Sequence, residues 1–344
     1  MLIKNALPLD FSGVTRLTQA GRLSEATAAI QQLLRQGSPG AAVNDPAPGR
    51  VIDAEFSEVG RPGQFISASF ASEAGTRPYK LYIPSSYAGT PLPLIVMLHG
   101  CTQNPDDFAA GTRMNELAEE RGCFVLYPAQ TPTANRSRCW NWFKRGDQGR
   151  DKGEPALLAG MTRECMSRYA IDPDRVYLAG LSAGGAMAAV LATAYPDLYA
   201  AVGVHSGLAV GSAHDVQSAF AAMQGKTARR SAARRADGGA IPAIVFHGDR
   251  DTTVHPSNGE QVARDSAQPH ATSSVDQGQV PGGHAYTRTV HRDAEGRTVL
   301  EHWLVHGAGH AWSGGSASGS YTDPKGPDAA RAMLRFFEKS RLRP

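Results

Sequence analysis

The sequence predicts a doubly wound α/β fold, in which a mostly parallel sheet carries helices on both of its faces. Segments of strand length, rich in apolar and β-branched residues, alternate along the chain with longer segments of helical periodicity. Some of the strand segments, such as 93–98, are apolar throughout, which is typical of strands that are covered on both sides. This alternation is the signature of a parallel sheet covered by helices.

The elements are expected in alternating order after two opening strands. Strands are expected at 65–70, 79–83, 93–98, 123–127, 176–179, 200–204, 241–246 and 299–305. Helices are expected at 106–121, 155–169, 183–195, from about residue 256, and at 328–339. The helix at 183–195 is built from small residues, whereas the segment 299–305 is β-branched and alternating, as a strand is.

Residues 1–50 are expected to form an appendage to the main domain. Apolar residues at roughly helical spacing within 14–35 predict two short amphipathic helices, broken near Gly21, that dock or contact a second copy. Residues 36–50 are rich in Gly, Pro and Ala and are expected to form a linker. The main domain is therefore expected at 51–344.

Composition and charge exclude several classes of protein. The 344 residues are 41% hydrophobic and 19% charged, as in ordinary globular chains, and no apolar run approaches the roughly 20 residues of a membrane-spanning helix. The net charge of +3 is too small to indicate nucleic-acid binding, and the basic segment 226–235 is expected to be solvated surface. Because no export signal is visible, a cytoplasmic location is expected, with mostly reduced cysteines.

Residues 180–184, Gly-Leu-Ser-Ala-Gly, match the G-x-S-x-G nucleophile elbow. They lie between an expected strand and an expected helix, which is the context that the motif requires. Ser182 is therefore the candidate nucleophile. The helix that begins at Ala183 directs its amino terminus at the reaction centre, where its N–H groups and dipole stabilise an oxyanion.

A serine nucleophile needs a base and an acid, which in such folds follow it in the order Ser, Asp or Glu, His. Asp249 and Asp251 both lie in the polar loop after strand 241–246, and the residues alone leave the choice between them open. His310, in a glycine-containing loop after the last strand, is preferred as the base over His306. His302, His306 and His310 are spaced four residues apart, which on a helix would suit a metal site. The strand pattern of 299–305 and the glycines that follow it argue against a helix, so we interpret the spacing as accidental.

The second donor to the oxyanion is expected after the third strand, where His99-Gly100-Cys101 follows. The backbone N–H of Cys101 is the candidate donor, with the Ala183 N–H as its partner. Three of the four tryptophans lie in the expected active-site loops and suggest an apolar cleft. The candidate cleft walls are Trp140, Trp142, Trp312 and the loop around Ser206.

Several blocks, in order, resemble the polyhydroxybutyrate depolymerase family of esterases, which is allied to the feruloyl and acetylxylan esterases. The resemblance covers about 78–315 and rests on the blocks 98–103, 139–143, 171–177, 179–187, 247–254 and 309–315. It implies an α/β-hydrolase catalytic domain at 51–344 and a carboxylic ester hydrolase acting through an acyl-enzyme on short-chain or hydroxyalkanoate esters. Alternatives are a feruloyl or acetylxylan type esterase, and a binding module that has lost catalysis.

The resemblance also assigns roles to individual residues. In the family's His-Gly-x-x-Asp-x-x-Val block the acid is Asp251, and the base is His310. Cys101 and Cys139 each lie in a family motif at the site, so a disulfide between them is expected, with Cys123 and Cys165 isolated. No metal or cofactor is expected. Because related enzymes are exported, secretion is the alternative to a cytoplasmic location, and the oligomeric state is not predicted.

Overall fold

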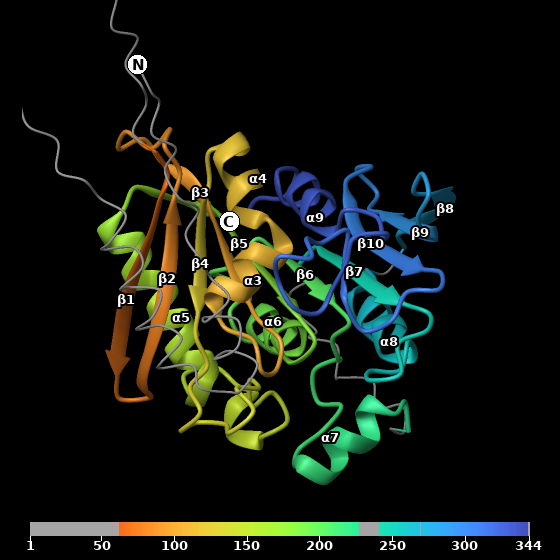
Figure 1. Cartoon of the computed structure of the whole chain (residues 1–344), viewed down its shortest axis with the longest axis horizontal. Coiled ribbons are helices and arrows are strands. Elements are labelled where there is room, and N and C mark those ends of the chain that lie inside the picture. The colour runs from red at the N-terminus through yellow and green to blue at the C-terminus, as the bar shows by residue number, and fades with distance from the viewer. Residues whose placement is uncertain (1–61, 227–240, 269, 343–344) are drawn as a thin grey trace, which may run out of the picture. The chain divides into compact units, whose positions relative to one another are not determined.

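The structure is built on one large sheet whose central strands run parallel. A computed structural model describes residues 62–226, 241–268 and 270–342. The predicted appendage at 1–50 and most of the basic segment 226–235 lie outside these residues. Ten strands form one sheet in the order β1-β2-β4-β3-β5-β6-β7-β10-β9-β8 (Figure 1).

The strands from β4 to β10 in this order run parallel, and an antiparallel pair extends the sheet at each edge. The strands are β1 Gln64–Ser72, β2 Gly75–Ile83, β3 Leu92–Leu98, β4 Phe124–Pro128, β5 Ile171–Leu181, β6 Ala201–His205, β7 Ala243–Gly248, β8 Thr272–Gln279, β9 Ala285–Arg292 and β10 Thr298–Val305. A short parallel pair, β11 Trp312–Ser313 with β12 Thr322–Asp323, stands apart from the sheet.

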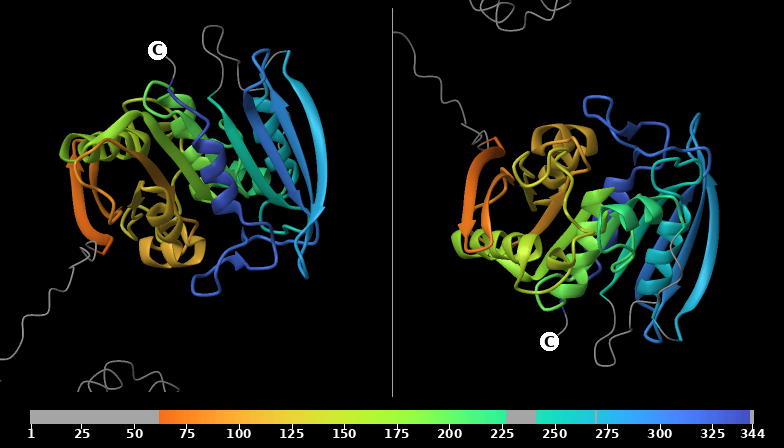
Figure 2. Two further views of the ribbon diagram at one scale, coloured as in Figure 1. Left: turned by 90° about the horizontal axis from the view of Figure 1, so that it is seen from above. Right: turned by 90° about the horizontal axis from the view of Figure 1, so that it is seen from below.

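Helices pack on both faces of the sheet and bury one apolar core on each (Figure 2). They are α3 Pro105–Thr112, α4 Met114–Arg121, α5 Gly153–Arg168, α6 Ala183–Ala194, α7 Val216–Met223, α8 Ser257–Ser266 and α9 Ala329–Phe337, with a 3₁₀ turn η1 Arg145–Asp147. α5, α6 and α8 contribute to one core, and α3, α4 and α9 to the other. The predicted doubly wound arrangement is confirmed.

Two expectations about the helices and strands need correction. The helix expected at 106–121 is two helices, because Arg113 between them has a left-handed backbone, with φ of 54°. The strands β8 and β9 and the helix α7 were not expected. β8 is polar and almost fully exposed, so it lacks the apolar alternation from which strands are predicted.

Candidate active site

Ser182 occupies a sharp turn between the central strand β5 and α6. Its φ of 57° and ψ of −119° are costly for a residue with a side chain, and such strain is characteristic of functional positions. The turn is possible because its neighbours lack side chains. A Cβ on Gly180 would lie 2.4 Å from the backbone of Gly184, and a Cβ on Gly184 would lie 2.0 Å from the Leu98 carbonyl oxygen.

His310 and Asp251 meet at the carboxyl ends of β10 and β7. The His310 Nδ1 donates to the Asp251 Oδ2 at 2.7 Å, which leaves Nε2 as the proton acceptor of the ring. Burial opposes ionisation of Asp251, but hydrogen bonds from His247 and His310 and from the Val254 amide outweigh it. The pKa of Asp251 therefore lies well below its usual range, and the carboxylate stays charged beside the imidazole.

Asp249, the other candidate acid, has a different partner. Its Oδ2 accepts from the His306 Nδ1 at 3.0 Å, and its Oδ1 accepts from the Gly307 amide at 2.7 Å. The Thr287 hydroxyl lies 2.9 Å from the His306 Nε2. Geometry thus sorts the four side chains into two pairs, and only the pair of Asp251 and His310 is largely buried.

His205 links Ser182, the candidate nucleophile, to the segment that follows His310, the candidate base, and the sequence did not indicate this role. Its carbonyl oxygen accepts from the Ser182 amide at 2.8 Å, and its Nε2 accepts from the Ser313 amide at 2.9 Å. Burial, together with the nearby imidazoles of His247 and His310, lowers the pKa of His205 to about 3. The ring therefore stays neutral and keeps an acceptor nitrogen for Ser313. The only sequence signal was a histidine at the end of a buried strand.

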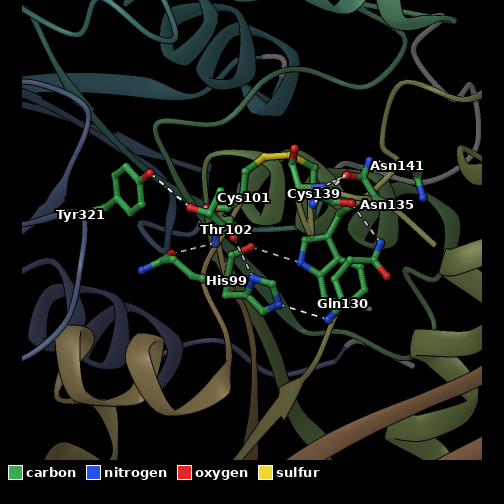
Figure 3. Close-up of a disulfide and its surroundings, with 12 residues drawn as sticks. His99, Cys101, Thr102, Gln130, Asn135, Cys139, Asn141 and Tyr321 are labelled. Atoms are coloured by element: carbon green, nitrogen blue, oxygen red, sulfur yellow. Dashed lines mark hydrogen bonds between the residues drawn. A yellow bond between two sulfur atoms is a disulfide. The ribbon is translucent and has the colours of Figure 1, made fainter. Parts of the chain in front are cut away.

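The expected oxyanion loop packs directly against the start of α6. The close approach of Gly184 to the carbonyl groups of Leu98 and His99 brings this helix terminus next to the segment that carries Cys101. The predicted disulfide between Cys101 and Cys139 is confirmed, with 4.2 Å between the Cα atoms (Figure 3). Cys123 and Cys165 are free and buried, and burial raises the pKa of both thiols to about 12.

His99 anchors the expected oxyanion loop from inside. Its Nδ1 donates to the Gly100 carbonyl oxygen at 2.7 Å, and its Nε2 accepts from the Gln130 amide at 3.1 Å. The Trp140 indole donates to the His99 carbonyl oxygen at 3.1 Å. Burial lowers the pKa of His99 to about 4, so the ring is neutral and can keep both bonds.

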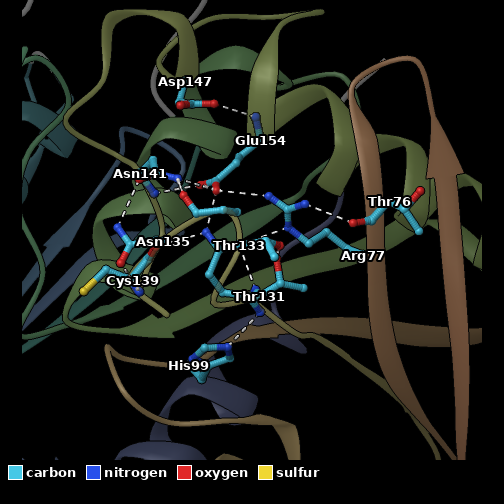
Figure 4. Close-up of polar contacts among 12 residues, drawn as sticks. Thr76, Arg77, His99, Thr131, Thr133, Asn135, Cys139, Asn141, Asp147 and Glu154 are labelled. Carbon is cyan, nitrogen blue, oxygen red and sulfur yellow. Dashed lines mark hydrogen bonds and ion pairs between the residues drawn. The ribbon is translucent and has the colours of Figure 1, made fainter. Parts of the chain in front are cut away.

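A buried carboxylate, Glu154, holds the segment beyond Cys139 in place (Figure 4). It accepts from the Asn141 backbone at 2.7 Å, from the Asn141 side chain at 2.8 Å, and from the Gln130 side chain. The Arg77 guanidinium lies 3.5 Å away and also donates to the Gln130 side chain at 2.9 Å. Since Gln130 donates in turn to the Cys139 carbonyl oxygen, the network joins β2 and α5 to the disulfide.

The expected cleft walls need correction for all four residues, because each of them is buried in the structure. Trp140 and Trp312 are 0% and 1% exposed, and Ser206 is fully buried, so none of these side chains offers a surface to a substrate. Each tryptophan belongs to an apolar core, and Trp312 stacks on His205 at 5.0 Å. Trp142 is 5% exposed and packs edge-on against Phe143. Indole rings carry a large apolar area, so burying them contributes strongly to a core.

The three histidines at four-residue spacing do not converge. His302 is partly buried in β10, whereas His306 and His310 bind separate carboxylates. Within the described ranges, no three His, Cys, Asp or Glu side chains are grouped so as to hold a metal ion. None of the helices described is long and apolar enough to cross a membrane.

Comparison with known proteins gives three findings. Residues 77–270 match a family model described as Esterase PHB depolymerase. A poly(3-hydroxyalkanoate) depolymerase C from Paucimonas lemoignei is 32% identical over 253 residues, which cover 70% of this chain and 60% of that protein. A feruloyl esterase B from Thermothelomyces thermophilus is 28% identical over 248 residues, covering 67% of this chain and 82% of that protein.

The chain spans about 60% of the length of the curated depolymerases that it matches. Among solved structures, an acetyl xylan esterase from Aspergillus awamori superposes with a TM-score of 0.62 at 20% identity, covering 80% of this chain and 99% of the other. This likeness concerns the fold alone, and it confirms the α/β-hydrolase architecture.

Proposed function

The chain belongs to the esterase PHB depolymerase family, and from this premise we propose that it is a serine carboxylic ester hydrolase acting on short-chain or hydroxyalkanoate esters. The observation that supports the proposal most strongly is the Asp251–His310 pair, bonded at 2.7 Å on loops at the same edge of the sheet as the strained Ser182. The proposal assigns the reaction to the domain at 51–344.

The reaction proceeds in two halves. His310 accepts the Ser182 proton at Nε2 while the Ser182 Oγ attacks the ester carbonyl carbon. Asp251 orients the imidazole and stabilises its charged form. The backbone N–H groups of Cys101 and Ala183 bind the oxyanion, each worth on the order of 3 kcal/mol.

Collapse of the tetrahedral intermediate breaks the carbon–oxygen bond to the alcohol, which takes the proton from His310. Water then attacks the acyl group on Ser182, with His310 as the base, and the carboxylic acid leaves. Each half returns the imidazole to its neutral form. No step needs a metal or a cofactor.

Hydrolysis of p-nitrophenyl butyrate tests the proposal. We expect activity in the intact chain, with loss of at least about a thousandfold in kcat for Ser182→Ala. Equal turnover by Ser182→Ala would contradict the mechanism. No hydrolysis of any ester by the folded chain would instead support the alternative of a non-catalytic binding module.

A second candidate is a feruloyl or acetylxylan type esterase, which the similarity to feruloyl esterase B favours. A panel of hydroxybutyrate oligomers, feruloyl esters and acetylated sugars separates the candidates. We expect turnover of short acyl chains of about two to six carbons and of hydroxybutyrate oligomers, because apolar sites discriminate single methylenes only by about 1–3 kcal/mol. A clear preference for feruloyl esters or acetylated sugars would favour the second candidate.

The disulfide bears on the two locations expected from the sequence. Disulfides persist mainly in oxidising compartments and are rare in the cytosol. The Cys101–Cys139 bond therefore supports secretion over the cytoplasm in our proposal. Alkylation of free thiols in intact cells tests this. If Cys101 and Cys139 were alkylated, the disulfide would be absent in the cell and the cytoplasmic alternative would be favoured.

A further inference from the structure

One exposed aromatic ring lies beside the expected oxyanion loop. Tyr321 is 48% exposed, one of four large apolar side chains that are exposed among the described residues. Its hydroxyl lies 3.2 Å from the Thr102 Oγ1, although the two residues are 219 positions apart (Figure 3). Thr102 directly follows Cys101, whose amide is the proposed oxyanion donor. The ring is thus tied to the loop that binds the ester carbonyl.

The direction of the hydrogen bonds fixes the orientation of this ring. The Thr102 hydroxyl donates to the Cys101 carbonyl oxygen at 2.6 Å, which uses its only proton. The Tyr321 hydroxyl must therefore donate to Thr102. With its polar end committed in this way, Tyr321 presents the apolar part of its ring to the surroundings.

The backbone at Tyr321 is held in an unfavourable conformation. Its φ is 52°, in the left-handed region that a bulky side chain rarely adopts. The residues on both sides are fixed: the Ser320 amide donates to Asp107 at 2.8 Å, and the Thr322 hydroxyl donates to the Ser316 carbonyl oxygen at 2.8 Å. The Tyr321 carbonyl oxygen accepts from the Trp312 amide at 2.7 Å. Such strain persists where the surroundings over-determine it, and it is often associated with function.

We propose that Tyr321 is a specificity-determining residue whose ring forms an apolar wall for the acyl chain of the ester, an inference that rests on the proposed esterase function. His310 must reach the oxygen of the leaving alcohol, so the alcohol lies on the side of the base. The Tyr321 backbone is bonded to Trp312, two residues beyond His310, while the hydroxyl at the end of its ring is bonded to Thr102, beside the proposed oxyanion donor. The tryptophans expected to form this wall are buried, which leaves Tyr321 as the exposed ring at that place.

The test is a chain-length series with variants of this ring. Purified full-length Tyr321→Ala, Tyr321→Phe and wild type are assayed on p-nitrophenyl acetate, butyrate and hexanoate. In Tyr321→Ala we expect kcat/KM to fall about tenfold for butyrate and hexanoate but less than about threefold for acetate, since acetate has no chain to contact the ring. Tyr321→Phe keeps the ring and should keep the chain-length preference.

A matched control is Val275→Ala, which truncates another exposed apolar side chain, on the edge strand β8. It should leave the three values unchanged. If Tyr321→Ala does not fold, Tyr321→Asn provides the second variant, because Asn tolerates the left-handed backbone at this position. It also removes the ring and should flatten the preference in the same way.

An equal loss of kcat/KM on all three esters in Tyr321→Ala would overturn the proposal, because it would indicate a purely structural role. An unchanged preference would overturn it as well. Either result leaves the esterase function standing as long as Ser182→Ala abolishes activity. Activity that survives in Ser182→Ala would instead contradict the proposed function itself.

Discussion

The two pairs of aspartate and histidine differ in burial although they lie on the same two loops. His310 is 11% exposed in its side chain and its carboxylate partner is fully buried, whereas the side chains of His306 and Asp249 are 39% and 32% exposed. A charged pair in a low-dielectric setting interacts more strongly than one in water. Asp249 also binds the Gly307 amide, so it fastens the two loops together next to the buried pair.

Alanine substitutions should separate the two pairs. We expect Ser182→Ala and His310→Ala to lower kcat by at least about a thousandfold, and Asp251→Ala by somewhat less, because the three act as a unit. Asp249→Ala should be mild, since its partner His306 is not the proposed base. Steady-state kinetics on p-nitrophenyl butyrate measures this. If Asp249→Ala were as damaging as Ser182→Ala while Asp251→Ala resembled wild type, the acid would be Asp249.

Motif and context were enough to nominate some of these residues but not others. Ser182 was predictable because its five-residue motif lies between a strand and a helix, and His310 because glycines follow the last strand. The choice between Asp249 and Asp251 depended on which imidazole each carboxylate reaches, and that is a property of loop packing. His205 and Tyr321 gave no specific signal, because a histidine at a strand end and a tyrosine in a loop look the same in the sequence wherever their side chains point.

At the scale of elements, the contact between α6 and β3 depends on the absence of a Cβ at residue 184. In Gly184→Ala the new carbon would lie 2.0 Å from the Leu98 carbonyl oxygen, far inside contact distance, so α6 must shift. We expect loss of about 1–3 kcal/mol of unfolding free energy and more than a tenfold loss of kcat. Gly146→Ala, where nothing lies within 4 Å of the new carbon, is the control for thermal unfolding and kinetics. Unchanged activity in Gly184→Ala would show that the contact is not needed.

The network around Glu154 is predicted to act on catalysis from a distance. Glu154→Gln removes the negative charge of a carboxylate that accepts hydrogen bonds from Asn141 and Gln130. It also replaces one acceptor oxygen with an amide NH₂ group, which would face the donors that now bind the carboxylate. We expect kcat to fall about tenfold with KM little changed, because the oxyanion loop shifts while the substrate still binds. Glu164→Gln, on the same helix with a surface partner Arg168, is the control. Equal losses in kcat for both variants would refute the specific role of Glu154.

The disulfide should contribute to both stability and turnover. It closes a loop of 38 residues, and opening it should lower the unfolding free energy by about 2–4 kcal/mol. Turnover should fall too, since Cys101 lies in the proposed oxyanion loop. Urea unfolding and kinetics with and without dithiothreitol measure both effects. In Cys101→Ser/Cys139→Ser the reductant should change nothing, because the remaining cysteines are already free.

The elements that the sequence predicted share strong local patterns. β3, β4, β6, β7 and the second half of β5 are short, largely apolar runs, and α6 is a long run of small residues, so each is specified by its own composition. α7 carries a capping box from Asp215 to Ser218 that could have revealed it. β8 and β9 could not be found in this way, because they are stabilised by pairing with each other and with β10.

At the scale of the whole molecule, three imidazoles with lowered pKa values make stability depend on pH. Burial lowers the pKa of His99 and His302 to about 4 and that of His205 to about 3, against roughly 6.5 for a free histidine. Below pH 6.5 the unfolded chain therefore binds more protons than the folded one, so stability is complete above that pH and falls as the pH drops toward 4.

We expect a loss of about 1 kcal/mol per pH unit for each of these histidines between pH 6 and 5. Urea unfolding at pH 7, 6 and 5 measures it. His302→Leu, which removes one of the three without touching the proposed triad, should reduce the slope by about one third. A free energy of unfolding that is constant over this range would contradict the prediction.

The order of strands also determines which strands a foreign chain or a protease would reach first. β5, β7 and β10, which lead to Ser182, Asp251 and His310, all lie inside the sheet, while the rims are β1 and β8. Rim strands are where a foreign chain can pair and where a protease can clip a fraying segment. Neither rim strand leads to one of the three proposed triad residues, and β9 lies between the rim strand β8 and β10. The antiparallel pairs at the two edges thus shield the parallel strands that lead to the proposed triad.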